Sequence, residues 1–176
     1  MNFMRQIGFT LIELMVTIAI LAIVLAIAIP SFGTLQAGTR LTTQVNDLVS
    51  VLSYARVEAL KRGSRVTVCT SSDGASCTSS GNWDQGWIVF NDDCTTGTVG
   101  TVDTGCAEAA LKRHVALASG YTLTGVSAIA NLVTFTSTGA PQQNGTFSLC
   151  SSAASKSVVL SSTGRLSVSE TGASCS

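Results

Sequence analysis

The feature that most constrains this chain is an apolar run from Phe9 to Ile29, in which the single charged residue among 21 is Glu13. As an α-helix, a run of this length extends roughly 31 Å, close to the hydrocarbon thickness of a bilayer. The preceding residues include Arg5 and no acid, which keeps the N-terminus cytoplasmic by the positive-inside preference. We therefore expect residues 9–30 to span the inner membrane of a bacterium and the remainder to lie in the periplasm.

A cleaved secretory signal is the alternative, because Ala26-Ile27-Ala28 has the small-x-small form of a cleavage site. Against it, the apolar run is longer than the usual core of about 7–15 residues and it contains Glu13. A carboxylate inside a membrane costs roughly 2.5–3.5 kcal/mol on insertion scales. Glu13 therefore requires a cationic partner, which we expect from another subunit or from a processed N-terminus.

Composition narrows the function classes. Charged residues are 11% of the chain, and 10 basic residues balance 10 acidic ones, so no net positive field holds the chain to nucleic acid. The single histidine, His114, leaves little material for a histidine metal centre or a Ser-His-Asp triad. Together with its neighbours Lys112 and Arg113, we interpret it as part of a basic surface cluster. We expect no enzyme active site, metal or cofactor.

A second helical segment is predicted over residues 31–63. Apolar residues recur there at spacings of three and four, which is the pattern of one buried stripe on an amphipathic helix: Leu41, Val45, Leu48, Leu52, Ala55 and Ala59. Pro30 is expected to kink the helix or loosen a turn, and Gly63 to cap its end. We expect the stripe to pack on a sheet of the same chain, with a coiled-coil seam as the alternative.

After Gly63 the apolar period changes from helical to alternating, which predicts β-strands. The predicted strands are residues 65–69, 87–90, 121–124, 132–136, 146–149, 158–160 and 165–168. Turn dipeptides separate them: Asp73-Gly74, Thr138-Gly139, Asn144-Gly145 and Thr163-Gly164. We expect Asn144-Gly145 to form a hairpin turn. The predicted fold is α+β: a long N-terminal helix, membrane-spanning and then amphipathic, packed on an antiparallel β-sheet or sandwich in residues 64–176.

The residues Gly8-Phe9-Thr10-Leu11-Ile12-Glu13-Leu14 resemble the prepilin signature. The resemblance implies that residues 1–8 are a leader, removed by prepilin peptidase between Gly8 and Phe9, and that the new N-terminus is methylated. It also implies that Glu13 meets the N-terminal amine of a neighbouring subunit during assembly. Such a pairing would make a buried carboxylate tolerable in lipid.

The segments 55–62, 66–69 and 83–90, with Gly164-Arg165 near the end, are similar to the GspH/FimT group of minor pilins and minor pseudopilins. The resemblance implies a subunit that primes or joins a type IV pilus or a type II secretion pseudopilus. Its partners would be other minor and major pilins or pseudopilins, the prepilin peptidase and the inner membrane. The choice between the two machines stays open at the level of sequence.

Six cysteines in an exported domain predict disulfides: Cys69, Cys77, Cys94, Cys106, Cys150 and Cys175. Six cysteines allow 15 pairings, and sequence alone does not choose among them. We favour sequential pairing, 69–77, 94–106 and 150–175, because the first two bridges close short loops and the third holds a terminus. None of the pairs has zinc-knuckle spacing.

DNA binding at a pilus tip is the alternative function. DNA-uptake members of the group resemble one another in a C-terminal Gly-Arg-x-Arg element, and this chain has Gly164-Arg165-Leu166-Ser167 there. Arg165 and Lys156 are the candidate contacts. Because Ser167 replaces the second basic residue, one phosphate contact is lost and binding is weakened. DNA is therefore a possible partner that we do not favour.

Two further groups have a structural and a functional interpretation. A binding platform is the functional interpretation of Trp83 and Trp87, but their spacing beside a strand favours core packing. Four acids in a Gly- and Thr-rich stretch lack EF-hand spacing, and we interpret them as solvated loop residues rather than calcium ligands: Asp84, Asp92, Asp93 and Asp103.

Overall fold

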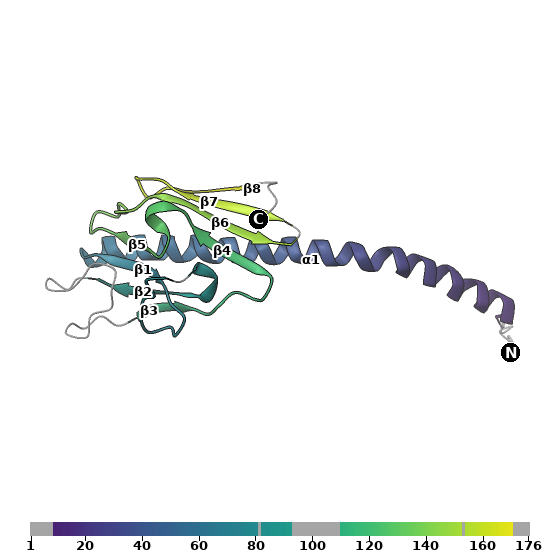
Figure 1. Cartoon of the computed structure of the whole chain (residues 1–176). Helices are drawn as coiled ribbons and strands as arrows, with labels where there is room; N and C mark the ends of the chain where they lie inside the picture. Colours follow the sequence, from purple (N-terminus) through teal and green to yellow (C-terminus); the bar gives the residue numbers. More distant parts are fainter. Residues whose placement is uncertain (1–8, 81, 93–109, 153, 171–176) are drawn as a thin grey trace, which may run out of the picture. The chain divides into compact units, whose positions relative to one another are not determined.

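The computed structural model of this chain describes residues 9–80, 82–92, 110–152 and 154–170, with the side chains of 27–37 and Ser127 left aside. One helix and eight strands are found in these ranges, together with two short 3-10 helices (Figure 1). Internal contacts divide the chain into two units, Met1–Ala37 and Gly38–Ser176.

Helix α1 runs from Leu11 to Arg62, so the helical backbone does not end at Pro30. In the first unit the large apolar side chains from Leu11 to Leu25 are about half exposed or more. Within the described residues, no helix has both the length and the apolarity needed to cross a bilayer. The membrane-spanning role of residues 9–30 stays a prediction.

In the second unit, α1 buries the stripe that the spacing predicts. All six predicted residues are at most 2% exposed, and Val51 joins them. The helix ends where Gly63 adopts a φ of 65° and its N–H donates to the carbonyl of Ala59 at 2.9 Å. A positive φ suits glycine because it lacks a Cβ, so the predicted cap is confirmed.

The strands form two four-stranded sheets, and every pairing between described strands is antiparallel. The first sheet has the order β3-β2-β1-β5, from Ala110–His114, Trp87–Asn91, Val66–Thr70 and Leu132–Phe135. The second sheet has the order β4-β6-β7-β8, from Tyr121–Gly125, Gly145–Ser151, Ser155–Leu160 and Leu166–Glu170. The predicted α+β class is confirmed, with α1 laid on both sheets (Figure 1).

The structure differs from the sequence prediction at one strand and at one turn. Strand β3 was not predicted, because Ala110–His114 shows no apolar alternation; it pairs with β2 through a register shift between Val89 and Phe90. Asn144-Gly145 is not a hairpin turn, because β5 before it lies in the first sheet and β6 after it lies in the second. The turn dipeptide instead marks the place where the chain passes between sheets.

The two tryptophans lie in the core between α1 and the sheets. Trp83, in the 3-10 helix η1 (Trp83–Gln85), is fully buried, and Trp87 is 1% exposed. The indole Nε1 of Trp83 donates to the carbonyl of Ile129 at 3.0 Å, and its ring meets Phe147 edge-on at a centroid distance of 5.1 Å. The core interpretation of both residues is confirmed.

Candidate functional site

The candidate assembly residues lie at the start of α1. Phe9 is 81% exposed, and its predicted cleavage partner Gly8 lies outside the described residues. The hydroxyl of Thr10 accepts a hydrogen bond from the backbone N–H of Glu13 at 3.3 Å. Thr10 is thus the N-cap and Glu13 the third helical residue, the Thr-x-x-Glu arrangement of a capping box.

This arrangement gives Glu13 a structural role that the sequence interpretation overlooked. A carboxylate in the first turn interacts favourably with the helix dipole, and Glu13 is the acid of that turn. The Thr-x-x-Glu spacing before an apolar run was the available signal. Glu13 is solvent-exposed in the described chain, so the ion pair with a neighbour's amine stays a prediction.

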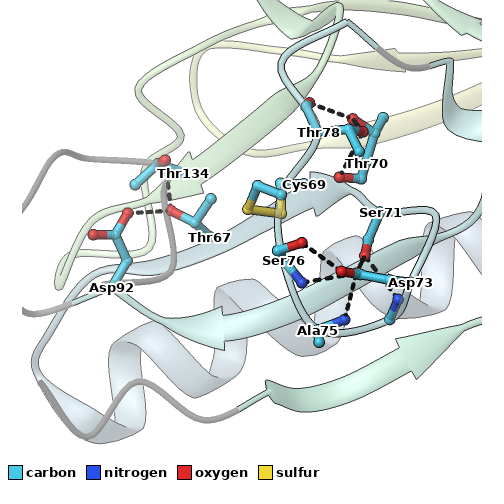
Figure 2. The surroundings of a disulfide bond; sticks show 12 residues. Thr67, Cys69, Thr70, Ser71, Asp73, Ala75, Ser76, Thr78, Asp92 and Thr134 are labelled. Atoms are coloured by element: carbon cyan, nitrogen blue, oxygen red, sulfur yellow. Dashed lines mark hydrogen bonds between the residues drawn. A yellow bond between two sulfur atoms is a disulfide. The ribbon is translucent and has the colours of Figure 1, made fainter. Parts of the chain in front are cut away.

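The disulfide between Cys69 and Cys77 is present, as the sequential pairing predicts (Figure 2). It links the buried strand β1 to the loop that follows it. Cys69 packs with Ile88 and Phe90 in a small apolar cluster, which is separate from the main core, and Cys77 and Leu132 border this cluster. The bridge therefore holds the loop against the first sheet.

The exposed side chain of Asp73 organises the same loop through hydrogen bonds (Figure 2). One carboxylate oxygen accepts from the N–H groups of Ala75 and Ser76 at 2.8 and 2.9 Å, and from the hydroxyl of Ser71 at 3.0 Å. The other accepts from the hydroxyl of Ser76 at 2.6 Å. These donors, the Ser76 hydroxyl first, hold the pKa of Asp73 well below its ordinary value.

The other cysteines are only partly described. Cys150, in β6, is disulfide-bonded, whereas Cys94, Cys106 and Cys175 lie outside the described residues. The 94–106 and 150–175 pairings stay predictions.

Asp92 corrects the interpretation of the loop acids. Its side chain is 1% exposed rather than solvated. One carboxylate oxygen accepts from the Thr67 hydroxyl at 2.6 Å, and that hydroxyl lies 2.7 Å from the hydroxyl of Thr134 (Figure 2). The other oxygen is 3.8 Å from the guanidinium of Arg65. Asp92 thus ends a buried polar chain across β1 and β5, with these oxygens already engaged.

No calcium site is found in the part of the chain that the structure describes. Asp84 is half-buried there, and its backbone carbonyl accepts from the N–H of Leu117 at 2.8 Å. Asp93 and Asp103 lie outside the described ranges, so the interpretation of these two acids is untested.

Arg165 occupies the exposed end of the turn between β7 and β8. Its N–H donates to the Ser161 hydroxyl at 3.0 Å, and its carbonyl accepts from the Ser161 N–H at 2.9 Å. The preceding Gly164, at a φ of 78°, is buried, and its carbonyl accepts from the Arg56 guanidinium at 2.9 Å. The turn that presents Arg165 is therefore fastened to α1.

A second turn of the same geometry lies beside it. In both turns the glycine has positive φ and donates back to the first turn residue, as Gly139 does to Thr136. A Cβ on Gly164 would stand 3.0 Å from the Gly139 carbonyl and 3.2 Å from the Arg56 guanidinium. The two Thr-Gly turns thus meet on one face of α1. Sequence analysis missed Arg56 because its contact is 108 residues away.

The structure does not bring the two candidate DNA contacts together. Lys156 lies at the far end of β7 from Arg165, about 15 Å along the strand at 3.3 Å per residue. Its ammonium is 3.0 Å from the carboxylate of Glu170, which competes with any phosphate. Lys156 and Arg165 therefore form no joint basic site.

His114 is not a member of a surface basic cluster. Its ring stacks on Trp87 at a centroid distance of 3.9 Å and an interplanar angle of 8°. Nδ1 lies 2.7 Å from the Val115 carbonyl and Nε2 lies 3.9 Å from the Asp47 carboxylate. The histidine ties β3 to α1, whereas Lys112 and Arg113 are exposed.

Comparison with solved structures defines the class of fold. Two crystal structures of the type IV minor pilin FimU of Pseudomonas aeruginosa superpose on this chain with TM-scores of 0.56 and 0.53. They cover 76% and 73% of this chain and 90% and 91% of FimU, at 21% and 20% identity. The fold is therefore that of a type IV pilin-like protein.

Matches to family models identify the family within this fold class. Residues 44–164 match the model of the type II transport protein GspH, and residues 3–29 match the prokaryotic N-terminal methylation motif. Because the first match covers more than half of the chain, this protein belongs to the GspH family. Two proteins of P. aeruginosa named fimbrial protein are 44% identical over 61 residues, which are 35% of this chain and 39% of each relative.

Proposed function

We propose that this chain is a minor subunit of a type IV pilus or of a type II secretion pseudopilus. The observation that carries the proposal is the combination of an N-terminal methylation motif over residues 3–29 with a GspH ectodomain over 44–164. The fimbrial names of the relatives also support it. The chain acts by assembly and catalyses no reaction.

In this proposal prepilin peptidase removes residues 1–8, and the new N-terminus at Phe9 is methylated. Residues 9–30 hold the subunit in the inner membrane, with its N-terminus cytoplasmic and its ectodomain periplasmic. The disulfide between Cys69 and Cys77 supports an oxidising compartment. In the filament, Glu13 pairs with the N-terminal amine of a neighbouring pilin.

The first experiment tests processing in the native host. Mass spectrometry of the isolated subunit is expected to show a methylated Phe9 at the N-terminus. The Gly8→Val variant is expected to accumulate as the unprocessed chain, because the bulkier side chain occupies the cleavage position. A mature chain that begins at Ile29 would contradict the membrane-anchored subunit and support signal-peptide cleavage.

The second experiment tests assembly and distinguishes the two machines. Deletion of the gene is expected to reduce either surface pili or type II secretion, and the wild-type chain to restore the lost activity and to appear in sheared filaments. A deletion strain that retains both activities would contradict the proposal.

A further inference from the structure

The edges of the two sheets differ in how they are protected against added strands. An unpaired edge exposes backbone N–H and C=O groups, and proteins block it with charge, proline or a covering segment. Beside β5, Pro141 bridges Phe135 and the N–H of Gln142 donates to the Thr134 carbonyl at 2.8 Å. On β3, Lys112 and Arg113 are exposed charges, and β4 packs against η1.

Among the described residues, strand β8 has no proline and no covering segment, and its one charge lies at the end of the strand. Its sequence is Leu166-Ser167-Val168-Ser169-Glu170, without lysine or proline, and the last four residues are exposed. Figure 1 shows β8 at the margin of the second sheet, with β7 on its inner side. The one charge, Glu170, is held at the end of the strand by Lys156 at 3.0 Å.

The apolar face of this sheet also continues to the unprotected edge. Val158 and Val168 are paired across β7 and β8, so both side chains point to the α1 side of the sheet. Val158 is 1% exposed, yet Val168 is 48% exposed. Leu166, on the same face, packs on the main core. The main core therefore covers Val158 on β7 but leaves Val168 on the neighbouring strand β8 half exposed.

The ladder determines which backbone groups point away from β7. The Ser161 N–H donates to the Arg165 carbonyl at 2.9 Å, and antiparallel pairs alternate between bonded and non-bonded. Residues 165, 167 and 169 therefore direct their backbone groups toward β7. Leu166, Val168 and Glu170 direct theirs outward, where an added strand would bond to them.

We propose that β8 accepts an extended segment from a different subunit, which adds a fifth strand to the β4-β6-β7-β8 sheet; this inference rests on the proposed assembly function. Backbone hydrogen bonds to Leu166, Val168 and Glu170 provide the affinity. The segment carries apolar side chains at alternate positions, to cover Val168 beside Leu166. Its other face carries small or hydroxyl side chains, to lie beside Ser167 and Ser169.

A second copy of this chain does not fit the edge. Antiparallel pairing of two β8 strands reverses one copy relative to the other, because β8 extends alongside α1 within the second unit (Figure 1). Subunits of a filament share one polarity. Parallel pairing of two β8 strands requires a two-fold axis that runs along the strands. This rotation turns the sheet of the second copy over, so that Val168 of one copy lies on the same face as the serines of the other. The edges β3, β4 and β5 are less suited to joining two copies, because charges, η1 or the Pro141 segment lie against them.

The test is site-specific photocrosslinking in the full chain, expressed in the native host. Benzoylphenylalanine at Ser167 is expected to give an adduct with an identified filament subunit, through a segment of the alternating pattern. Benzoylphenylalanine at Thr122, on the edge strand β4, is the matched control and is expected to give no such adduct. An adduct between two copies of this chain through β8, or no adduct at Ser167, would overturn the proposal.

Two variants link the adduct to the edge. Val168→Pro removes an outward N–H and leaves the β7 ladder intact, and we expect the adduct to fall about tenfold, the equivalent of one or two backbone hydrogen bonds. Val168→Thr keeps the N–H and is expected to retain most of the adduct. Equal crosslinking in wild type and Val168→Pro would overturn the proposal. If the proline variant is degraded, Val168→Lys is an independent way to block strand addition at β8.

Filament fractionation separates this proposal from the function on which it rests. Wild-type chain in the filament fraction without a crosslink at Ser167 would overturn the edge proposal and leave the assembly function standing. Wild-type chain absent from the filament fraction would overturn both.

Discussion

The two parts of α1 differ in the exposure of their apolar side chains. In the second unit a single stripe, with members such as Leu48 and Leu52, is at most 2% exposed against the sheets of the same chain. In the first unit, Leu11, Ile12 and Leu14 are 58–76% exposed, and their helical spacing places them on different faces of the helix. One neighbouring surface is enough to bury a single apolar stripe, whereas a helix that is apolar all round is buried only by lipid or by several other helices. We therefore expect the first part of α1 to find its apolar contacts in lipid or in other subunits.

The largest expected effect comes from a matched pair of leucine substitutions, one in each part of α1. Leu52→Ala is expected to lower the free energy of unfolding by about 3–5 kcal/mol, through lost burial and the cavity that remains. Leu21→Ala removes the same atoms from an exposed position and is expected to leave ectodomain stability unchanged. Thermal unfolding of the full chain in detergent, followed by the near-ultraviolet signal of Trp83 and Trp87, measures both.

Equal destabilisation by the two variants would show that the first part of α1 is supported by the ectodomain. The comparison would then fail, because the exposed helix would depend on its own chain and not on an external partner.

The second prediction concerns Glu13, where capping and charge can be separated. Glu13→Gln keeps a residue that suits a capping box but removes the charge that pairs with a neighbour's amine. We expect it to weaken incorporation into filaments by about 2–5 kcal/mol, the range for loss of one partner of a buried charge pair. Ectodomain stability is expected to stay at the wild-type value. Quantitative immunoblots of sheared filaments and membranes measure the partition.

Glu13→Ala is the companion variant, because it removes the capping side chain as well as the charge. We expect it to lose slightly more assembly than Glu13→Gln, by about 0.5–1 kcal/mol. Wild-type assembly by Glu13→Gln with a defect confined to Glu13→Ala would assign Glu13 to helix capping and refute the ion pair.

The third prediction probes a contact that the ectodomain supplies to itself. Cys77→Ser removes the bridge to Cys69, and loop entropy for so short a loop gives a loss of about 2–3 kcal/mol. The same variant is expected to insert into the membrane as wild type does. Chemical unfolding of the full chain with and without reductant provides the measurement. A reductant effect that persists undiminished in Cys77→Ser would assign the stabilisation to other cysteines.

The sequence predicted best those features that depend on local spacing. The buried stripe of α1, the cap at Gly63 and the bridge from Cys69 to Cys77 all join residues that are close in the chain. Strand β3 was missed because Ala110–His114 is a strand only through its pairing with β2. Asn144-Gly145 was assigned to a hairpin because a turn signal does not reveal which sheet the next strand joins.

The candidate site shows the same division. Thr10 and Glu13 form a capping box that their spacing alone could have revealed. The bond between Arg56 and Gly164, and the pairing of Lys156 with Glu170, depend on how α1, β7 and β8 fold together. No local pattern separates an arginine that fastens a turn from one that stays in solvent.

The smallest expected effect concerns Asp73. The loop after β1 is held both by the disulfide and by the Asp73 carboxylate, and this prediction separates the two contributions. The pKa of Asp73 is lowered by the hydroxyl and N–H groups of Ser76 and by Ala75 and Ser71. A lowered pKa means that the stabilisation is present above the ordinary carboxyl range and is lost as the pH falls through the folded-state value. Between these limits the wild-type loop is expected to keep its structure, whereas Asp73→Asn is expected to open it at every pH. Hydrogen exchange at the N–H groups of Ala75 and Ser76 measures this local opening, with Gly63 as the reference amide.

Because Asp73 is exposed and Cys69–Cys77 holds the loop ends, global unfolding is expected to change little. A large fall in global stability in Asp73→Asn would show that the carboxylate, rather than the disulfide, is the principal support of the loop.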